Sequence, residues 1–195
     1  MTNGKRGPLF LILFAALMAG AGNGISIVAF PWLVLQRNGS AVNASIVAMA
    51  GTLPLLVATL IAGAAVDYLG RRRVSMISDA LSAASVAAVP VLALIFGVQV
   101  INVGVLAGLA ALGAFFDPAG MTARETMLPE AATRAGWTLD RSNSVYEAVF
   151  NLAYIVGPGI GGLAIATLGG VNTMWVTAAA FVMSIAAIAV LRLEG

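Results

Sequence analysis

Apolar residues fill six long stretches of the chain, and polar residues gather in the segments between them. A helix needs about 20 mostly apolar residues to cross roughly 30 Å of hydrocarbon. Lipid offers the backbone no partners, and barrel strands would alternate over only about ten residues. We therefore expect an all-α polytopic membrane protein. Its single bundle over 1–195 has six transmembrane helices, at 8–35, 43–66, 74–96, 100–119, 145–167 and 171–191.

Positive charges lie almost entirely on one side of these expected spans, with a predicted cytoplasmic loop over 120–144. Only Arg37 falls on the opposite side. The other Lys and Arg residues share the side of both termini: Lys5, Arg6, Arg71, Arg72, Arg73, Arg124, Arg134, Arg141 and Arg192. Cytoplasmic segments carry an excess of Lys and Arg. This predicts a multi-pass protein of the plasma (inner) membrane with both termini in the cytoplasm.

Composition narrows the available chemistry. Charged residues make up 9% of the chain and hydrophobic residues 61%, whereas soluble domains average about 25% charged. The absence of Cys and His excludes disulfides, thiolate or imidazole metal ligands, and Ser-His or Cys-His catalytic pairs. We expect no enzyme activity, no metal and no cofactor. The arginines flank apolar segments, so the expected partners are membrane lipids and a small-molecule substrate rather than nucleic acid.

A charged turn joins the second and third expected spans. It reads Gly63-Ala-Ala-Val-Asp67-Tyr-Leu-Gly70-Arg71-Arg72-Arg73. A small residue ends one helix, a carboxylate follows four positions on, a glycine lies where the chain reverses, and three arginines open the next helix. This spacing resembles the loop between the second and third helices of major facilitator superfamily transporters. The resemblance implies that the turn acts as a conformational switch.

Small residues dominate part of the fifth expected span, which contains Gly157-Pro158-Gly159-Ile160-Gly161-Gly162. Proline removes a backbone hydrogen bond and kinks a helix, while glycines let a neighbouring helix approach. The run resembles the Gly-Pro-x-x-Gly-Gly signature of the antiporter branches of the same superfamily; alone, it is equally consistent with a packing kink. Small residues four apart also predict close helix contacts at Gly20/Gly24, Gly104/Gly108 and Gly157/Gly161.

A third resemblance covers the segment from the fourth to the fifth span. Phe115-Phe-Asp-Pro-Ala119, Leu128-Pro-Glu130 and Asp140-Arg-Ser-Asn143 are similar to macrolide-efflux-like drug exporters. Together the resemblances imply the N-terminal half of a twelve-helix drug/proton antiporter, built from two inverted three-helix repeats. The arginine typical of the fourth helix is not found at 103–116, which carries no charge. This argues against proton coupling through that helix.

Four charged residues are expected to meet near the inner face: Asp67, Arg71, Asp79 and Asp117. Charges in a membrane are costly, roughly 2.5–3.5 kcal/mol each at the bilayer centre on insertion scales. One hypothesis is an ion-pair network that latches one conformation and breaks when access changes. The alternative is a static anchor that fixes topology.

Polar residues of the first and fifth spans are the candidates for substrate or proton contact. Glu147, Asn151 and Tyr154 recur at helical spacing and share one face, and Asn23 lies in the middle of the first span. Glu147 either binds a cation or proton, or caps the start of its helix. Substrate contact is assigned to Asn23, Asn151 and Tyr154.

The expected function is secondary active efflux of a lipophilic or amphiphilic molecule, coupled to protons. No phosphate-binding loop of the Gly-x-x-x-x-Gly-Lys type occurs, so pumping by ATP is not expected. Alternating access rocks one six-helix bundle against another. With both termini on one side, two copies would insert in parallel, which predicts a homodimer. The alternatives are a fragment or non-transporting scaffold that pairs with a separate C-terminal half.

Overall fold

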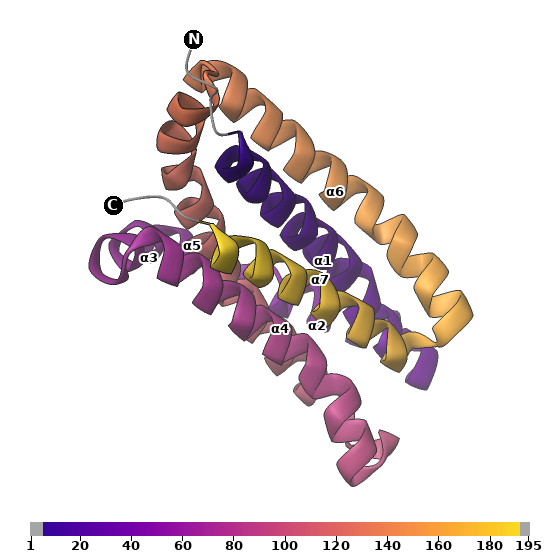
Figure 1. The fold of residues 1–195 in the computed structure, drawn as a ribbon. Coiled ribbons are helices and arrows are strands. Elements are labelled where there is room, and N and C mark those ends of the chain that lie inside the picture. The colour runs from indigo at the N-terminus through magenta and orange to yellow at the C-terminus, as the bar shows by residue number, and fades with distance from the viewer. Residues whose placement is uncertain (1–5, 192–195) are drawn as a thin grey trace.

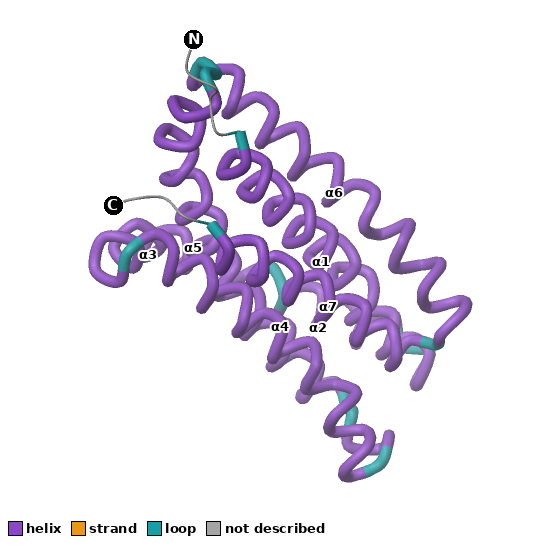
Figure 2. The backbone as a smooth tube through the Cα atoms, viewed as in Figure 1, coloured by secondary structure: helices purple, strands orange, loops and turns teal. Residues whose placement is uncertain are grey.

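The computed structural model describes residues 6–191 and is all-helical over that range. Short turns join the helices (Figure 2). The elements are α1 (Gly7–Asn38), α2 (Ala41–Ala50), α3 (Leu53–Leu69), α4 (Arg71–Phe96), the 3-10 turn η1 (Val98–Val100), α5 (Val103–Ala135), α6 (Leu139–Leu168) and α7 (Gly170–Val190). The expected all-α class is confirmed. Lys5 and Arg192, counted above for orientation, lie outside the described residues.

Six segments of the described chain are long and apolar enough to span a membrane, in agreement with the expected number. The second span differs in detail because it consists of two helices, α2 and α3. Gly51 and Thr52 form the turn between them, and Pro54 lies in the first turn of α3. Proline has no backbone N–H to donate, so it favours a helix start over continuation of α2 at this position.

The expected loop at 120–144 is wrong as a description of secondary structure. Helix α5 continues to Ala135, α6 begins at Leu139, and only residues 136–138 form the turn. The polar residues of this segment alternate with a buried apolar face: Leu128 and Ala131 pack with Leu9 of α1 and Ile188 of α7. An amphipathic end of a helix therefore produced the polarity that predicted a loop.

The helices pack as two triplets that exchange equivalent contacts. The first triplet comprises α1, the α2–α3 pair and α4; the second comprises α5, α6 and α7. Helix α1 packs on α6 and α7 of the second triplet, and α5 packs on α3 and α4 of the first. Figure 1 shows α6 running beside α1, with α7 between α1 and α4. This reciprocal pattern fits the expected plan of two three-helix repeats.

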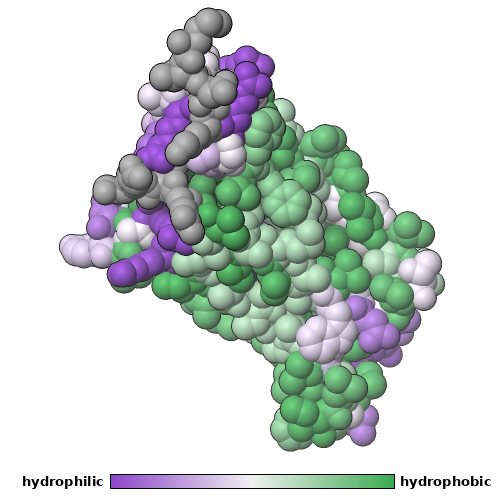
Figure 3. Space-filling model, in the orientation of Figure 1, coloured by the Kyte–Doolittle hydropathy of each residue, from purple (hydrophilic) through white to green (hydrophobic). Residues whose placement is uncertain are grey.

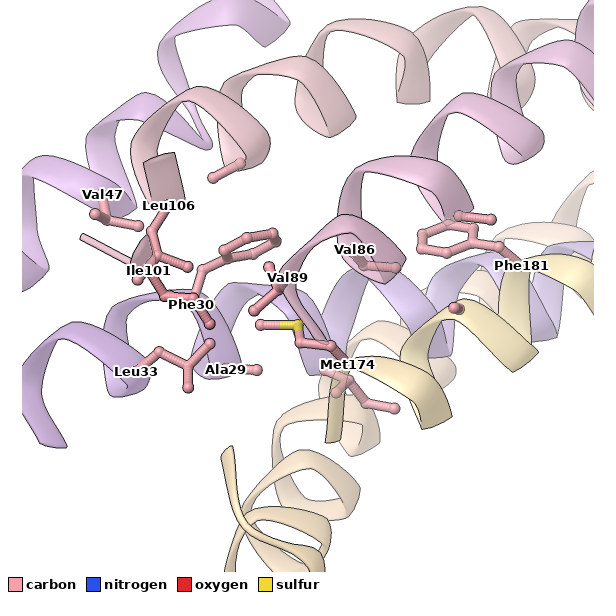
Figure 4. Packing of buried hydrophobic residues seen from close by; sticks show 14 of the residues in the cluster. Ala29, Phe30, Leu33, Val47, Val86, Val89, Ile101, Leu106, Met174 and Phe181 are labelled. Atoms are coloured by element: carbon pink, nitrogen blue, oxygen red, sulfur yellow. The ribbon is translucent and has the colours of Figure 1, made fainter. Parts of the chain in front are cut away.

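The largest buried cluster fills the part of the bundle farther from the start of α1. Phe30 and Leu33 of α1 meet Val86 and Val89 of α4, with Met174 and Phe181 of α7 (Figure 4). A second buried cluster lies around the start of α1, where Leu9 packs with Leu128 of α5 and Ile188 of α7. Each cluster joins helices from both triplets, so the triplets form one bundle.

On the face that Figure 3 shows, apolar residues cover most of the bundle, and polar residues gather at the end with the termini and in a smaller patch toward the other end. Large apolar side chains are exposed on the outer helices, including Leu60 of α3 at 83%, Leu94 of α4 at 78% and Ile155 of α6 at 73%. Such exposure would be unfavourable in water and suits lipid. The first turn of α1 and the last turn of α7 lie at the same end of the bundle (Figure 1).

Candidate functional site

A half-open cavity of about 380 Å³ lies between the helices, and every α-helix contributes to its wall. The wall is mostly apolar. Its aromatic side chains are Phe30 of α1, Phe150 and Tyr154 of α6, and Phe181 of α7. This combination of apolar and aromatic surface with few polar groups is typical of sites for small organic ligands.

A few polar groups face this cavity. Asp117 of α5 lines it and accepts a hydrogen bond of 2.7 Å from the Ser82 hydroxyl of α4. Asn23 and Ser26 of α1 also line it. The hydroxyl oxygen of Ser26 is buried, and no residue of the described chain hydrogen-bonds to it. The cavity therefore offers a carboxylate, the Asn23 amide and an unused hydroxyl in a mostly apolar wall that also includes Arg124.

A buried ion pair lies beside the cavity and joins three helices. Arg124 of α5 directs Nη1 at both carboxylate oxygens of Asp79 of α4, each 3.0 Å away. Ser184 of α7 donates to Asp79 Oδ2 at 2.6 Å. The side chains of Arg124 and Asp79 are only 2% and 3% exposed. A pair so deeply buried fixes its helices together, because removing one partner leaves the other charge without compensation.

Small residues bring α4 and α5 close enough for this pair to form. Ser75, Ser78, Ser82 and Ser85 are buried and recur at helical spacing on α4. A Cβ at Gly120 of α5 would lie 2.6 Å from the Ser78 Oγ, which is too close for any side chain. Ser78 instead donates to the Phe116 carbonyl at 2.5 Å. The α4–α5 contact is consequently polar and tight.

Arg124 is the residue that sequence reasoning missed. The expected fourth span ends at residue 119, so the sequence pattern places Arg124 in the predicted cytoplasmic loop, and 103–116 carries no charge. The structure corrects both points: α5 does carry a buried arginine, further along the same helix. A signal was present in the spacing. Asp117, Met121 and Arg124 follow one another at steps of four and three, so they share a face, and all three line the cavity.

The charged turn of the sequence lies at the polar end where α1 begins. Gly70 has φ +84° and ψ 139°, a conformation that glycine adopts readily and other residues avoid, so the chain can reverse there. Arg71 pairs with Glu130 of α5 and donates to the Thr126 carbonyl at 3.2 Å. Arg72 donates to the Ile188 carbonyl at 3.1 Å and to that of Ala189 in the last turn of α7.

The remaining positions of that turn make fewer contacts. Gly63, Asp67 and Arg73 are exposed. Within residues 6–191, Asp67 forms no ion pair. Glu130 accepts from Arg134 as well as Arg71, at 2.7 Å. Arg71 and Arg72 thus connect the start of α4 to the ends of α5 and α7.

The single expected network of Asp67, Arg71, Asp79 and Asp117 is therefore corrected to two separate groups. Asp79 and Asp117 do come together, around Arg124, inside the bundle. Arg71 belongs to the other group, with Glu130 at the polar end. The reason is geometric: two turns of α4 separate Arg71 from Asp79, about 12 Å along the helix at 1.5 Å per residue.

Glycines of the predicted antiporter motif form the contact between α6 and α1. A Cβ at Gly157 would lie 2.7 Å from the Gly24 Cα, and one at Gly161 would lie 3.3 Å from the Ile25 Cα. Gly20 faces Ala153 in the same contact. The close contacts expected at Gly20/Gly24 and Gly157/Gly161 are thus observed. Gly162 faces open space and Pro158 lies beside Gly24.

The prediction of a close helix contact at Gly104/Gly108 is wrong within the described chain. A Cβ at Gly108 would meet no atom within 4 Å, and one at Gly104 would meet only the side chain of Asn102 on its own segment. Spacing of small residues does not reveal which face of a helix meets a neighbour, and these two glycines lie on an exposed face of α5.

The four substrate or proton candidates divide into two pairs. Asn23 and Tyr154 line the cavity. Glu147 and Asn151 do not: both are exposed, and the Asn151 amide donates to Glu147 at 3.4 Å. Glu147 borders a different cleft, between α5 and α6, together with Glu125. The expectation that one face of α6 presents all three of its candidates to the cavity is not met.

The packing of two helix triplets around a cavity defines a transporter fold, and the comparison with known families agrees. Residues 12–194 match the model of the Major Facilitator Superfamily, and the chain belongs to that family. Its members are transporters rather than enzymes, as expected.

Named relatives are bacterial multidrug efflux pumps. The chain is 87% identical over all of its 195 residues to a multidrug efflux pump Tap of Mycolicibacterium fortuitum, covering 48% of that protein. It is 70% identical, again over its full length, to proteins of the same name from Mycobacterium bovis and Mycobacterium tuberculosis, covering 46% of each. The chain spans about half the length of these curated relatives.

Proposed function

We propose that this chain is one six-helix unit of a secondary transporter that exports lipophilic or amphiphilic small molecules. The observation that carries the proposal is the cavity: about 380 Å³ of mostly apolar and aromatic wall, with a carboxylate in it, inside a bundle suited to lipid. The relatives' description as multidrug efflux pumps supports export as the direction and several drugs as the cargo.

Transport by alternating access requires a second six-helix unit facing the cavity. One observation supports such a unit: the relatives are about twice as long as this chain. The second unit is either a copy of this chain, which gives a parallel homodimer, or a separate C-terminal six-helix segment.

Native mass spectrometry of the chain purified in mild detergent separates these arrangements. A dimer that transports would establish the homodimer. A monomer that transports only when a C-terminal segment is supplied would establish the two-segment arrangement and exclude the homodimer. A strict monomer that transports alone would contradict alternating access between two units.

The turn of Arg71 and Arg72 is proposed to latch the inner end of the bundle, in a plasma membrane protein whose termini face the cytoplasm. The pairs from Arg71 to Glu130 and from Arg72 to the last carbonyls of α7 join three helix ends of this bundle and fix the turn in one arrangement, which we propose changes when the second unit moves. Asp67 has no ion pair in residues 6–191. It is proposed to gain its partner in the other state, so Asp67→Asn should insert normally and transport poorly. Unaltered transport would favour the static anchor.

Flux into proteoliposomes tests the whole proposal. The chain, with its second unit present, is reconstituted, and uptake of a fluorescent amphiphile is followed with and without an imposed pH gradient. Flux that follows the gradient supports proton-coupled export. Flux that ignores the gradient removes proton coupling, and no flux of any amphiphile supports the scaffold alternative. Empty liposomes and Gly159→Ala, at an open position of α6 that the signature leaves variable, serve as controls.

A further inference from the structure

Two buried polar atoms next to the ion pair lack hydrogen-bond partners. They are Nε of Arg124 on α5 and the hydroxyl oxygen of Tyr146 on α6, and no residue of the described chain hydrogen-bonds to either. The two residues are only 2% and 1% exposed. A buried donor or acceptor that has lost water and gained no partner is costly, so such atoms in a native fold are normally paired.

These two groups lie beside each other and have complementary chemistry. The Tyr146 hydroxyl approaches the Arg124 guanidinium closely enough for each to act on the other, without reaching hydrogen-bond geometry. The other charged side chains that act on Tyr146 are Glu125 and Glu147. Within the guanidinium, Nη1 is already directed at both oxygens of Asp79, each 3.0 Å away. An Nε–H can only donate, and a hydroxyl oxygen can accept, so each group supplies what the other lacks.

Tyr146 belongs to the face of α6 that forms the aromatic wall of the cavity. Tyr146, Phe150 and Tyr154 follow one another at steps of four, so they share that face. The rings of Phe150 and Tyr154 are stacked with centroids 6.2 Å apart, and both residues line the cavity, as Arg124 does. The ion pair of Arg124 joins α4, α5 and α7. A hydrogen bond from Arg124 to Tyr146 adds α6 to that set.

We infer that Tyr146 is a positioning residue whose hydroxyl oxygen accepts a hydrogen bond from the Arg124 Nε–H. A small rotation of either side chain converts the contact into this bond. Because Nε is then held by α6, the guanidinium keeps Nη1 directed at Asp79, and the aromatic wall of α6 is fixed relative to the ion pair. This role goes beyond the proposed function, since it requires neither a second unit nor a transported molecule.

The first test observes the Arg124 Nε–H directly by NMR of the purified chain, labelled with ¹⁵N-arginine, in detergent. The signal is identified by its absence from the double variant Arg124→Met with Asp79→Leu. Tyr146→Phe removes only the hydroxyl and keeps the ring, and it should shift this signal and speed exchange of its proton with water about tenfold. Ser142→Ala is the matched control, because this buried hydroxyl of α6 bonds only the Thr138 carbonyl; it should leave the signal unchanged.

The second test asks whether the Tyr146 hydroxyl stabilises the bundle through Arg124. Tyr146→Phe should raise the unfolding equilibrium constant about fivefold to tenfold in the wild-type chain, measured by denaturant titration in detergent. In the background Arg124→Met with Asp79→Leu, the same change should have less than about a twofold effect, because the hydroxyl has already lost its partner. A hydroxyl that only fills space would give the same factor in both backgrounds.

Two results would overturn the inference. One is an Arg124 Nε–H signal with the same position and exchange rate in Tyr146→Phe as in the wild-type chain. The other is an equal effect of Tyr146→Phe on unfolding in both backgrounds. If the background variant does not fold, the signal is identified with Arg124→Lys and the exchange rate decides. A negative result leaves the proposed function as it stands, because neither measurement involves flux or a ligand.

Discussion

Two helix interfaces, here called seams, stabilise this bundle through different interactions. The α1–α6 seam is formed by Gly20 and Gly24 against Gly157 and Gly161, and it works by close approach of backbones. The α4–α5–α7 seam contains Arg124, Asp79 and Ser184, and it works by charge and hydrogen bonding. Within lipid, helices gain little from hydrophobic burial against each other, so both devices are needed. The first seam depends on shape alone, whereas the second responds to charge.

The largest expected effect comes from breaking the ion pair. Arg124→Met leaves the Asp79 carboxylate buried without its cation and should destabilise the bundle by about 3–5 kcal/mol. Thermal unfolding in detergent would show this as a large fall in Tm. Arg73→Met, on the exposed surface, is the matched control.

Replacing both partners sharpens the result. Arg124→Met combined with Asp79→Leu should recover most of the lost stability, because both charges are then gone and no unpaired charge remains buried. A double variant as unstable as Arg124→Met would mean that packing, rather than charge, determines the stability of this seam.

The α1–α6 seam is tested with two separate single variants of α6, each of which replaces a glycine with alanine. In Gly157→Ala the new Cβ would lie 2.7 Å from the Gly24 Cα, so α1 and α6 must separate, at a cost of about 1–3 kcal/mol. Gly162→Ala adds the same atom into open space and should be neutral or slightly stabilising, since alanine favours helix. Equal Tm values for the two variants would show that the seam is not tightly packed.

Ser184 allows a smaller change to the charged seam. Ser184→Ala removes the donor that lies 2.6 Å from Asp79 Oδ2 while Arg124 remains, so we expect a loss of about 1 kcal/mol. Ser45→Ala is the control, because that hydroxyl bonds only the Ala41 carbonyl of its own helix. A Tm change for Ser184→Ala no larger than that of the control would remove α7 from the account of this seam.

The smallest stability effect is expected where the charges are partly exposed. Glu130→Gln loses the pairs to Arg71 and Arg134, whose side chains are 34% and 29% exposed, and should cost less than about 1 kcal/mol. Flux is the informative measurement here, since the proposed latch should weaken although Tm barely changes. A large fall in Tm would instead assign Glu130 to the structural core.

The sequence was sufficient for features that depend on one segment at a time. Six apolar stretches predicted the number of spans, because crossing lipid requires only length and apolarity. Gly70 and the arginines after it predicted the turn between α3 and α4, which local backbone geometry decides. The same local motifs resembled the Major Facilitator Superfamily, and that resemblance is confirmed.

Features that depend on several helices required the tertiary structure. From its sequence position alone Arg124 is typical of a loop cation, because a charge near a helix end is tolerated in a loop or in the helix; the structure buries it against Asp79. The same uncertainty conceals the length of α5 and places Arg71 and Asp79 in one expected network, whereas the structure puts them in two groups. Of the candidates on α6, only Tyr154 reaches the cavity. Helical spacing identifies which residues share a face, but the packing of neighbouring helices decides what that face meets.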